Sequence, residues 1–472
     1  MATHEAGALH AAGHAPAWLL VPDDVNDLLQ PLWPVTAYKD ADGVLQVGGL
    51  PVTEIAAQVG TPAYVIDEAD FRGRATIMLG EFQEAFAAPP LAGADVYYAA
   101  KALITLGIAR WLVEDGLRVD VASGGELAIL VRAGMPGERI ALHGNNKADR
   151  DIETALQAGV GRIMIDSLPE INQVAGIAGR LGVKAKVMLR CSIGVEAHTH
   201  EYIATSHEDQ KFGLSVADGA GLEAVRRVLA RPELELLGVH SHIGSQIFDT
   251  NAFALAIHRL VALTATIAHE YGHACPELGL GGGFGVAYTT GHDPLTPRQT
   301  AQGMAAAVAK ECQAVGIAAP RVSVEPGRAI AAPAGITLYT VGVTKEVSLG
   351  GGFQRLYIAV DGGMSDNIRT ALYGADYSAT LASRRSEAPP RLARIVGQHC
   401  ESGDIVVKDE YMPADITAGD LVAVPVTGAY CRSMSSNYNA ALRPPVVAVK
   451  DGAIRTLVRR ETLEDLLATD LG

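Results

Sequence analysis

The sequence lacks the cysteine pattern of a disulfide-bonded or zinc-binding protein. Its five cysteines are odd in number, and no two of them are spaced as Cys-x-x-Cys. They are Cys191, Cys275, Cys312, Cys400 and Cys431. This usage argues against a disulfide framework and a structural zinc site, and it fits a reducing compartment. We therefore expect a cytoplasmic protein.

Long apolar runs and clusters of basic residues are also missing. No uninterrupted apolar stretch reaches about 18 residues, the length that predicts a membrane helix. Residues 1–34 contain no Lys or Arg, so they do not have the pattern of a secretory signal. The net charge is -15, and the basic residues form no run. We therefore expect neither a nucleic acid nor a membrane as partner.

The middle of the sequence alternates short β-rich runs with stretches of helical periodicity. The β-rich runs are residues 96–102, 119–122, 140–143, 162–165, 186–191, 237–242, 277–280 and 322–325. Strands that alternate with helices predict a parallel sheet. Eight such units over about 250 residues predict a (β/α)8 barrel of the TIM type.

A second pattern begins after about residue 333, where β-branched or alternating runs are separated by Gly, Pro and Asp turns. It predicts an all-β domain of Greek-key or β-barrel type. The strand-like run 62–67 should join this domain, which makes it discontinuous. We expect a β domain of residues 31–70 and 334–472, a barrel of residues 71–333, and a flexible arm of residues 1–30.

Polar or glycine residues follow several predicted strands, at the barrel end where active sites lie. Lys101 ends the first strand. A lysine that is desolvated there becomes a nucleophile or a Schiff-base former, whereas a lysine at the rim simply extends into solvent. The run 281–283 is three glycines, which together with Ser245 and Arg328 predict a phosphate site. A sharp turn is the alternative explanation for these glycines.

Glu325 ends the eighth predicted strand, where a carboxylate can keep a pyridine nitrogen protonated. A structural salt bridge between Glu325 and Arg328 is the alternative. His240 and His242 should share one face of the sixth strand, and His242 is the better candidate to stack on a cofactor ring. Metal-dependent amidohydrolase barrels also contain His-x-His, but on the first strand and with other ligands. We therefore expect no metal.

Together these motifs resemble the fold-type III decarboxylases that use pyridoxal phosphate (PLP). The shared motifs are Tyr98-Ala99-Ala100-Lys101-Ala102, the His-Ile-Gly-Ser of 242–245, the glycines of 281–283 and the Glu-Pro-Gly-Arg of 325–328. Motifs at 194–200, 211–213, 361–364, 372–374, 400–402 and 428–430, with Arg369, resemble the diaminopimelate decarboxylase branch. The resemblance runs from about Gly48 to near the end of the chain. Gln210 departs from it, because the family more often has Ser at this position.

The resemblance implies decarboxylation of meso-diaminopimelate to L-lysine and CO2, with PLP as cofactor. Lys101 would bond to the cofactor, His242 would stack on its ring, and Glu325 would hold its nitrogen. Ser245, Gly283 and Arg328 would bind its phosphate, with Tyr430 beside it. The residues that would bind substrate are Arg328, Arg369, Tyr373, Glu401 and Tyr430. Cys400 and Glu401 would enter the site of a second subunit in a homodimer, with Cys400 as the candidate proton donor.

Three alternatives remain at this point. A decarboxylase of another basic amino acid or of carboxynorspermidine would share the barrel, but Arg369 and Glu401 suit a distal carbon that carries both carboxylate and amine. A homologue that binds PLP without catalysis should have lost Lys101 or Cys400, and both are present. The third alternative is the metal-dependent amidohydrolase barrel.

Overall fold

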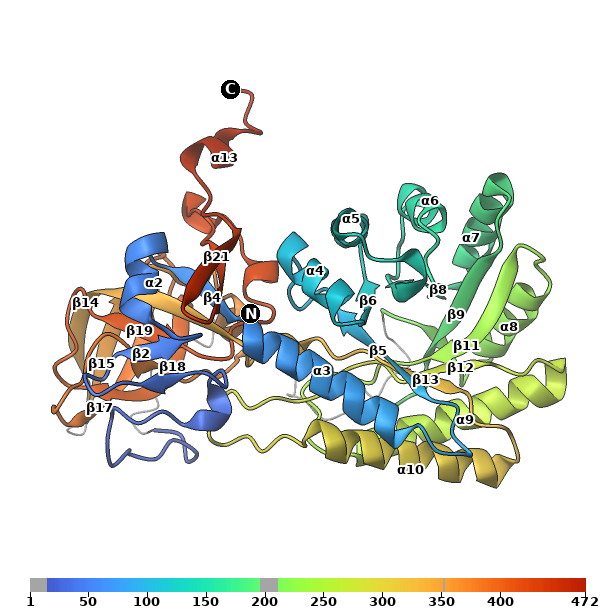
Figure 1. Ribbon diagram of the computed structural model, residues 1–472, viewed down its shortest axis with the longest axis horizontal. Helices are drawn as coiled ribbons and strands as arrows, with labels where there is room; N and C mark the ends of the chain where they lie inside the picture. The colour runs from blue at the N-terminus through green and yellow to red at the C-terminus, as the bar shows by residue number, and fades with distance from the viewer. Residues whose placement is uncertain (1–14, 196–210, 351–352) are drawn as a thin grey trace. The chain divides into compact units, whose positions relative to one another are not determined.

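The computed structural model describes residues 15–195, 211–350 and 353–472 (Figure 1). The chain divides into two compact units. The β unit comprises Met1–Phe71, Val286–Asp293 and Ala331–Gly472, and the barrel unit comprises Arg72–Gly285 and Pro294–Ile330. The β unit is thus discontinuous in sequence, and it includes a short segment that follows the seventh barrel strand. The domain limits expected from the sequence remain predictions.

Eight parallel strands close into a barrel in the barrel unit. They are β5 (Ala94–Ala99), β6 (Arg118–Val121), β7 (Ile140–Leu142), β8 (Arg162–Ile165), β9 (Ala185–Ser192), β11 (Leu234–His240), β12 (Glu277–Gly279) and β13 (Arg321–Val324). Each pairs with the next, and β13 pairs in parallel with β5, which closes the ring. The short β10 (Leu214–Ser215) adds to β9. The predicted TIM-type barrel is confirmed.

The helices that connect these strands begin and end where the local sequence favours it. They are α4 (Leu106–Glu114), α5 (Gly124–Ala133), α6 (Asp149–Gln157), α7 (Leu168–Leu181), α8 (Ala220–Leu229), α9 (Asn251–Tyr271) and α10 (Pro297–Val315). The Ser123 side chain accepts the N–H of Glu126 at the start of α5, and Gly134 ends that helix in the left-handed conformation. Thr296 and Gln299 form a capping box at the start of α10.

Helix α9 is long and apolar enough to cross a membrane by length and composition, and it is the one such helix among the described residues. One helix of this kind is a weak indication, because core helices of globular proteins have the same composition. Phe253, Leu260 and Val261 on α9 are buried, and the helix packs against α10. Its apolar face is therefore explained by packing within the barrel unit.

The β unit contains a large mixed sheet in the order β18-β17-β15-β14-β4-β20-β21, with β19 paired to β14 and β16 paired to β19. Its strands are β4 (Ala63–Asp67), β14 (Gly335–Gly350), β15 (Phe353–Val360), β16 (Thr380–Leu381), β17 (Pro390–Val396), β18 (Ile405–Pro413), β19 (Leu421–Val424), β20 (Val446–Lys450) and β21 (Ala453–Val458). Because β4 pairs with β14 and β20, the run 62–67 joins this sheet as predicted. The expected β-rich domain is confirmed.

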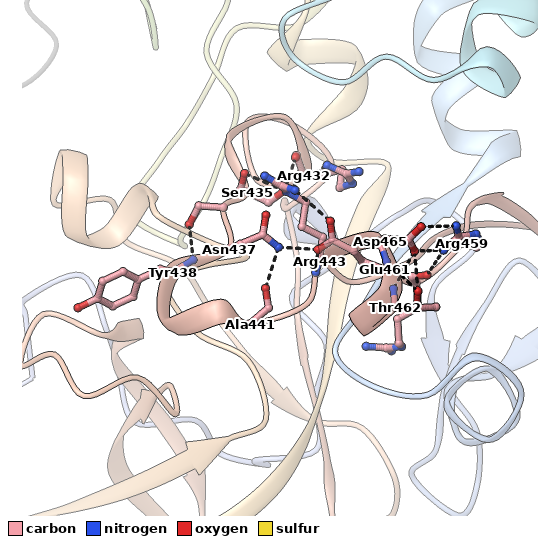
Figure 2. A network of polar contacts seen from close by, with 12 residues as sticks. Arg432, Ser435, Asn437, Tyr438, Ala441, Arg443, Arg459, Glu461, Thr462 and Asp465 are labelled. Carbon is pink, nitrogen blue, oxygen red and sulfur yellow. Dashed lines mark hydrogen bonds and ion pairs between the residues drawn. The ribbon is translucent and has the colours of Figure 1, made fainter. Parts of the chain in front are cut away.

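Two segments, one near each end of the described residues, are held by polar contacts within the β unit. Asn26, which lies in the expected arm, donates to the carbonyl of Ser386 at 2.8 Å and accepts its N–H at 3.0 Å. Near the other end, Glu461 accepts the side-chain amide of Asn437 at 2.5 Å and the N–H of Arg443 at 2.9 Å (Figure 2). These contacts fix the segment that follows Tyr430.

Candidate active site

The turn that carries Lys101 directly follows β5. The Tyr98 hydroxyl donates to the carbonyl of Leu103 at 2.7 Å, and the N–H of Ala100 donates to the carbonyl of Asp120 at 3.0 Å. These bonds hold the backbone of the turn at the carboxyl end of the barrel. Lys101 itself is exposed, which agrees with the alternative of a lysine at the barrel rim and not with a desolvated lysine.

Glu325 follows β13 and lies between two histidines from other strands. Nε2 of His240 lies 3.0 Å from Oε1 of Glu325, and Nε2 of His143 lies 3.3 Å from the same oxygen. The two imidazole rings meet edge to face, with centroids 5.3 Å apart. His240 is fully buried and His143 is nearly so. The barrel thus places one carboxylate against two buried imidazoles.

The burial of this cluster changes the pKa values of its members. Burial by itself would raise the pKa of Glu325, but the nearby His240 and His143 hold it well below its usual range. Burial, with the Glu325 charge next, raises the pKa of Asp120 on β6 well above its usual range. Burial lowers the pKa of His143 to about 4. At neutral pH we therefore expect Glu325 to be ionised, Asp120 to be protonated and His143 to be neutral.

The loops after β11 and β12 are joined by backbone hydrogen bonds. We call the glycines of residues 281–283, with the facing residues 244–247, the glycine cup. The N–H of Ile247 donates to the carbonyl of Gly283 at 2.9 Å, and the N–H of Gly285 donates to Ile247 at 3.1 Å. A Cβ atom at Gly283 would lie 2.5 Å from the carbonyl oxygen of Gly244, which requires glycine at this position. Nη2 of Arg328 donates to the Ser245 hydroxyl at 3.0 Å. Ser245, Gly283 and Arg328 therefore belong to one cluster.

His242 follows the end of β11 at His240 and lies next to Gly282 of the glycine cup. The expectation that His240 and His242 share one face of a strand is wrong for that reason. Nδ1 of His242 accepts the N–H of Gly282 at 3.2 Å, which orients the ring. Burial, followed by the charges of Lys101 and Arg190, holds the pKa of His242 well below its usual range. We therefore expect a neutral imidazole at this position.

The Glu325–Arg328 segment approaches the Lys101 turn closely. The N–H of Ala99 donates to the carbonyl of Pro326 at 3.3 Å. A Cβ atom at Gly327 would lie 2.8 Å from Cβ of Ala99, so this approach requires glycine. The strand-end residues of β5 and β13 are thereby neighbours.

A second cluster lies in the β unit around Arg369, which begins α12 (Arg369–Tyr373). Its guanidinium lies over three tyrosine rings, 5.2 Å from the centroid of Tyr288, 5.7 Å from Tyr430 and 5.8 Å from Tyr373. Arg369 and Tyr288 are buried. The predicted residues Arg369, Tyr373 and Tyr430 are thus brought together, with Tyr288 as an additional member.

Cys400 and Glu401 lie in the loop between β17 and β18. The carboxylate of Asp404 accepts the N–H groups of His399 at 2.7 Å and of Met364 at 2.6 Å. The N–H of Asp404 donates to the carbonyl of Glu401 at 3.1 Å. Cys400 is exposed, whereas the other four cysteines are buried. Asp404 therefore fixes the backbone on both sides of Cys400 and Glu401.

The predicted site residues thus fall into two groups. Lys101, His242, Ser245, Gly283, Glu325 and Arg328 belong to the barrel unit, and Arg369, Tyr373, Cys400, Glu401 and Tyr430 belong to the β unit. The sequence reading overlooked Asp120, Arg190, Tyr288 and Asp404. A charged residue inside a β-rich run was the available signal for the first two. The second His-x-His, at His198 and His200, lies outside the described residues.

Comparison with known proteins gives a consistent result. The family model of the pyridoxal-dependent decarboxylases, pyridoxal binding domain, matches residues 79–332. The chain is 50% identical to the diaminopimelate decarboxylase of Mycobacterium tuberculosis, over 95% of this chain and 100% of that protein. It is 49% identical to the diaminopimelate decarboxylase of Mycobacterium leprae, over 100% of both chains.

A solved structure agrees with these relatives. The diaminopimelate decarboxylase of M. jannaschii in complex with L-lysine matches with a TM-score of 0.86 and 30% sequence identity. The match covers 93% of this chain and 99% of that chain. The similarity therefore extends over both the barrel unit and the β unit.

Proposed function

The chain belongs to the diaminopimelate decarboxylases, a branch of the pyridoxal-dependent decarboxylases, and we propose that the barrel-unit cluster holds its cofactor and that the β-unit cluster binds its substrate. The reaction is the decarboxylation of meso-diaminopimelate to L-lysine and CO2, with pyridoxal 5'-phosphate as cofactor. Glu325 is the main support for assigning the barrel cluster to the cofactor. Its carboxylate is kept ionised beside the Lys101 turn and the glycine cup.

The barrel cluster fits this cofactor in three respects. The cup at 281–283 has no room for side chains, since a Cβ atom at Gly282 would lie 2.3 Å from the carbonyl oxygen of Glu325. Such a cup lets backbone N–H groups approach a phosphate. Glu325 offers an ionised partner for a protonated ring nitrogen, and Lys101 offers an amine. Nδ1 of the buried His240 is without a hydrogen-bond partner among the described residues, and its Nε2 lies 3.0 Å from Oε1 of Glu325, so the site is polar.

When bound, the cofactor supplies an electron sink for the electron pair that the loss of CO2 leaves behind. Lys101 would hold the cofactor through its amine. Glu325 would keep a proton on the ring nitrogen, and His242 would pack against the ring. Ser245, Gly283 and Arg328 would hold the phosphate.

The β-unit cluster supplies substrate recognition in this proposal. Arg369 is a buried guanidinium, and it pairs with the distal carboxylate of the substrate. Arg328, Tyr373, Glu401 and Tyr430 complete the substrate site. A substrate that lacks the distal carboxylate leaves Arg369 buried without its partner, which costs binding energy. Selection against lysine and ornithine follows from that cost.

We propose further that the protein is a cytoplasmic homodimer. Cys400 and its neighbour Glu401 lie in a loop whose backbone Asp404 fixes, and Cys400 is exposed. An exposed, rigid loop is suited to entering the site of a second subunit. Cys400 then holds the proton that replaces CO2 on the substrate carbon.

Release of lysine and CO2 from meso-diaminopimelate, with and without added PLP, tests the function. We expect PLP-dependent release that disappears in Lys101→Ala. The matched control is Lys310→Ala, because Lys310 is an exposed lysine on α10. PLP binding without any release would transfer the assignment to another substrate, and absence of PLP binding would contradict it altogether.

The shared site is tested by mixing two inactive variants, Lys101→Ala and Cys400→Ala. Subunit exchange should restore part of the activity, because a mixed dimer contains one site with both native residues. No recovery in a mixture that forms mixed dimers would show that each site is complete within one subunit.

A further inference from the structure

His143, His240 and Glu325 have the composition of a transition-metal site. They come from three separate strand ends of the barrel unit, those of β7, β11 and β13. One ligand atom from each lies within 4.8 Å of the other two. Two imidazoles and one carboxylate are a ligand set found in zinc enzymes, where a water molecule takes the fourth position.

The two distances from the histidine nitrogens to Glu325 are close to those between neighbouring ligands of a four-coordinate ion. Zinc binds histidine nitrogen and carboxylate oxygen at about 2.0–2.2 Å, which places neighbouring tetrahedral ligands about 3.3–3.5 Å apart. Nε2 of His143 lies 3.3 Å from Oε1 of Glu325, and Nε2 of His240 lies 3.0 Å from it. The two imidazole rings meet at 75°.

The hydrogen bonding of the two histidines also points to a missing ligand. Nδ1 of His240 is buried and has no hydrogen-bond partner among the described residues, and the Nε2 atoms of His143 and His240 both face the same Glu325 oxygen. Buried polar atoms are usually satisfied, so two imidazole nitrogens that share one acceptor have capacity for a further ligand.

We propose that, in the absence of pyridoxal phosphate, His143, His240 and Glu325 bind one divalent transition-metal ion such as Zn²⁺. The ion and the cofactor then exclude one another, because both require the Glu325 carboxylate. This exclusion rests on the role given to Glu325 in the proposed function. Zinc thereby slows the conversion of the cofactor-free protein into active enzyme, and added cofactor reverses the effect.

Metal titration of the protein freed of PLP tests the site directly. Co²⁺ is the probe, because its visible absorption reports four-coordinate binding, and the stoichiometry for Zn²⁺ is measured by calorimetry. We expect His143→Gln and His240→Gln each to weaken the binding of both ions by at least about tenfold. The matched control is His258→Gln, which removes an exposed histidine 2.7 Å from Glu311. His258→Gln should leave the metal titration unchanged. Metal binding by other histidines occurs equally in the native protein and in the three variants.

Titration with PLP in the presence of Zn²⁺ tests the exclusion. The apparent affinity for PLP should fall in proportion to free Zn²⁺ in the native protein and in His258→Gln, but not in the other two variants. PLP binding by those two variants without zinc shows that they are folded, and the two are examined separately in case one does not fold. Equal metal binding by all four proteins, or an affinity for PLP that Zn²⁺ does not change, would overturn the proposal. Lysine formation by metal-free holoenzyme tests the proposed function independently.

Discussion

Replacement of Gly281 by alanine should weaken cofactor binding, whereas the same replacement at Gly272 should not. Gly281 has a φ of +65°, and Gly272, at the end of α9, has a φ of +63°. An alanine in this left-handed region costs about 1–2 kcal/mol at either position. The two sites differ in their surroundings. A Cβ atom at Gly272 meets no atom within 4 Å, whereas at Gly281 it lies 2.7 Å from the carbonyl oxygen of Ser241.

The crowding at Gly281 must move the loop that carries His242. The same Cβ atom would lie 3.0 Å from Cα of His242, so relief separates His242 from the glycine cup. The hydrogen bond from Gly282 to His242 is then lost, which costs about 0.5–1.5 kcal/mol. If PLP binds only the arrangement that contains this hydrogen bond, the same free energy makes the binding of PLP roughly 2- to 12-fold weaker. Displacement of the N–H groups of the cup adds to it, so we expect about tenfold.

The assay is a PLP titration of the cofactor-free protein, followed by absorbance, with thermal unfolding measured in parallel. Both variants should lower the stability of the cofactor-free protein, Gly281→Ala by at least about 0.5–1.5 kcal/mol more because of the lost hydrogen bond. Only Gly281→Ala should lower the affinity for PLP. Equal affinities for PLP in the two variants would refute the assignment of residues 281–283 to the cofactor.

Three other predictions concern the β unit. Arg369→Lys should raise KM for meso-diaminopimelate by roughly 10- to 100-fold, with less effect on kcat. The reason is that an ammonium group cannot form the two-point pairing of a guanidinium with a carboxylate. An unchanged KM would show that Arg369 does not bind the substrate. Asp404→Asn keeps only one acceptor oxygen for the N–H groups of His399 and Met364. It should therefore lower kcat by roughly tenfold and speed the alkylation of Cys400. Native rates of both reactions would show that the loop does not depend on Asp404. Burial raises the pKa of Glu410 from 4.5 to about 7, so this residue contributes stability below pH 4.5 that is lost as the pH rises through 7, by about 3 kcal/mol. Glu410→Gln should therefore lose less stability than the native protein between pH 5 and pH 8 in thermal unfolding, and an identical pH profile would contradict the burial of a protonated carboxyl.

The barrel strands could be read from the sequence because their signal is local. Alternation of apolar runs with helical periodicity depends only on neighbouring residues, and it located all eight strands to within a few residues. The strand-end residues followed from the architecture, since a TIM-type barrel collects them at one end. Glu325, the glycine run and Lys101 were found in this way before any contact was known.

Burial and pairing could not be read in the same way. Asp120 and Arg190 were overlooked because a charged residue in a strand faces solvent or the barrel interior according to its neighbours across the sheet. The contact of His240 with Glu325, and the bond from Gly282 to His242, join strand ends that are distant in sequence. Tyr288 reaches Arg369 because the segment Val286–Asp293 belongs to the β unit, although it follows a barrel strand.

The sequence by itself thus determined the fold class, the family and the chemical types of the site residues, because these depend on order and spacing along the chain. The tertiary structure decided which of those residues lie in contact, which are buried, and which are ionised or protonated as a result. Those properties depend on distances of a few ångströms between separate strands. The ionised Glu325 between two buried imidazoles is the clearest case, since no stretch of sequence contains all three residues.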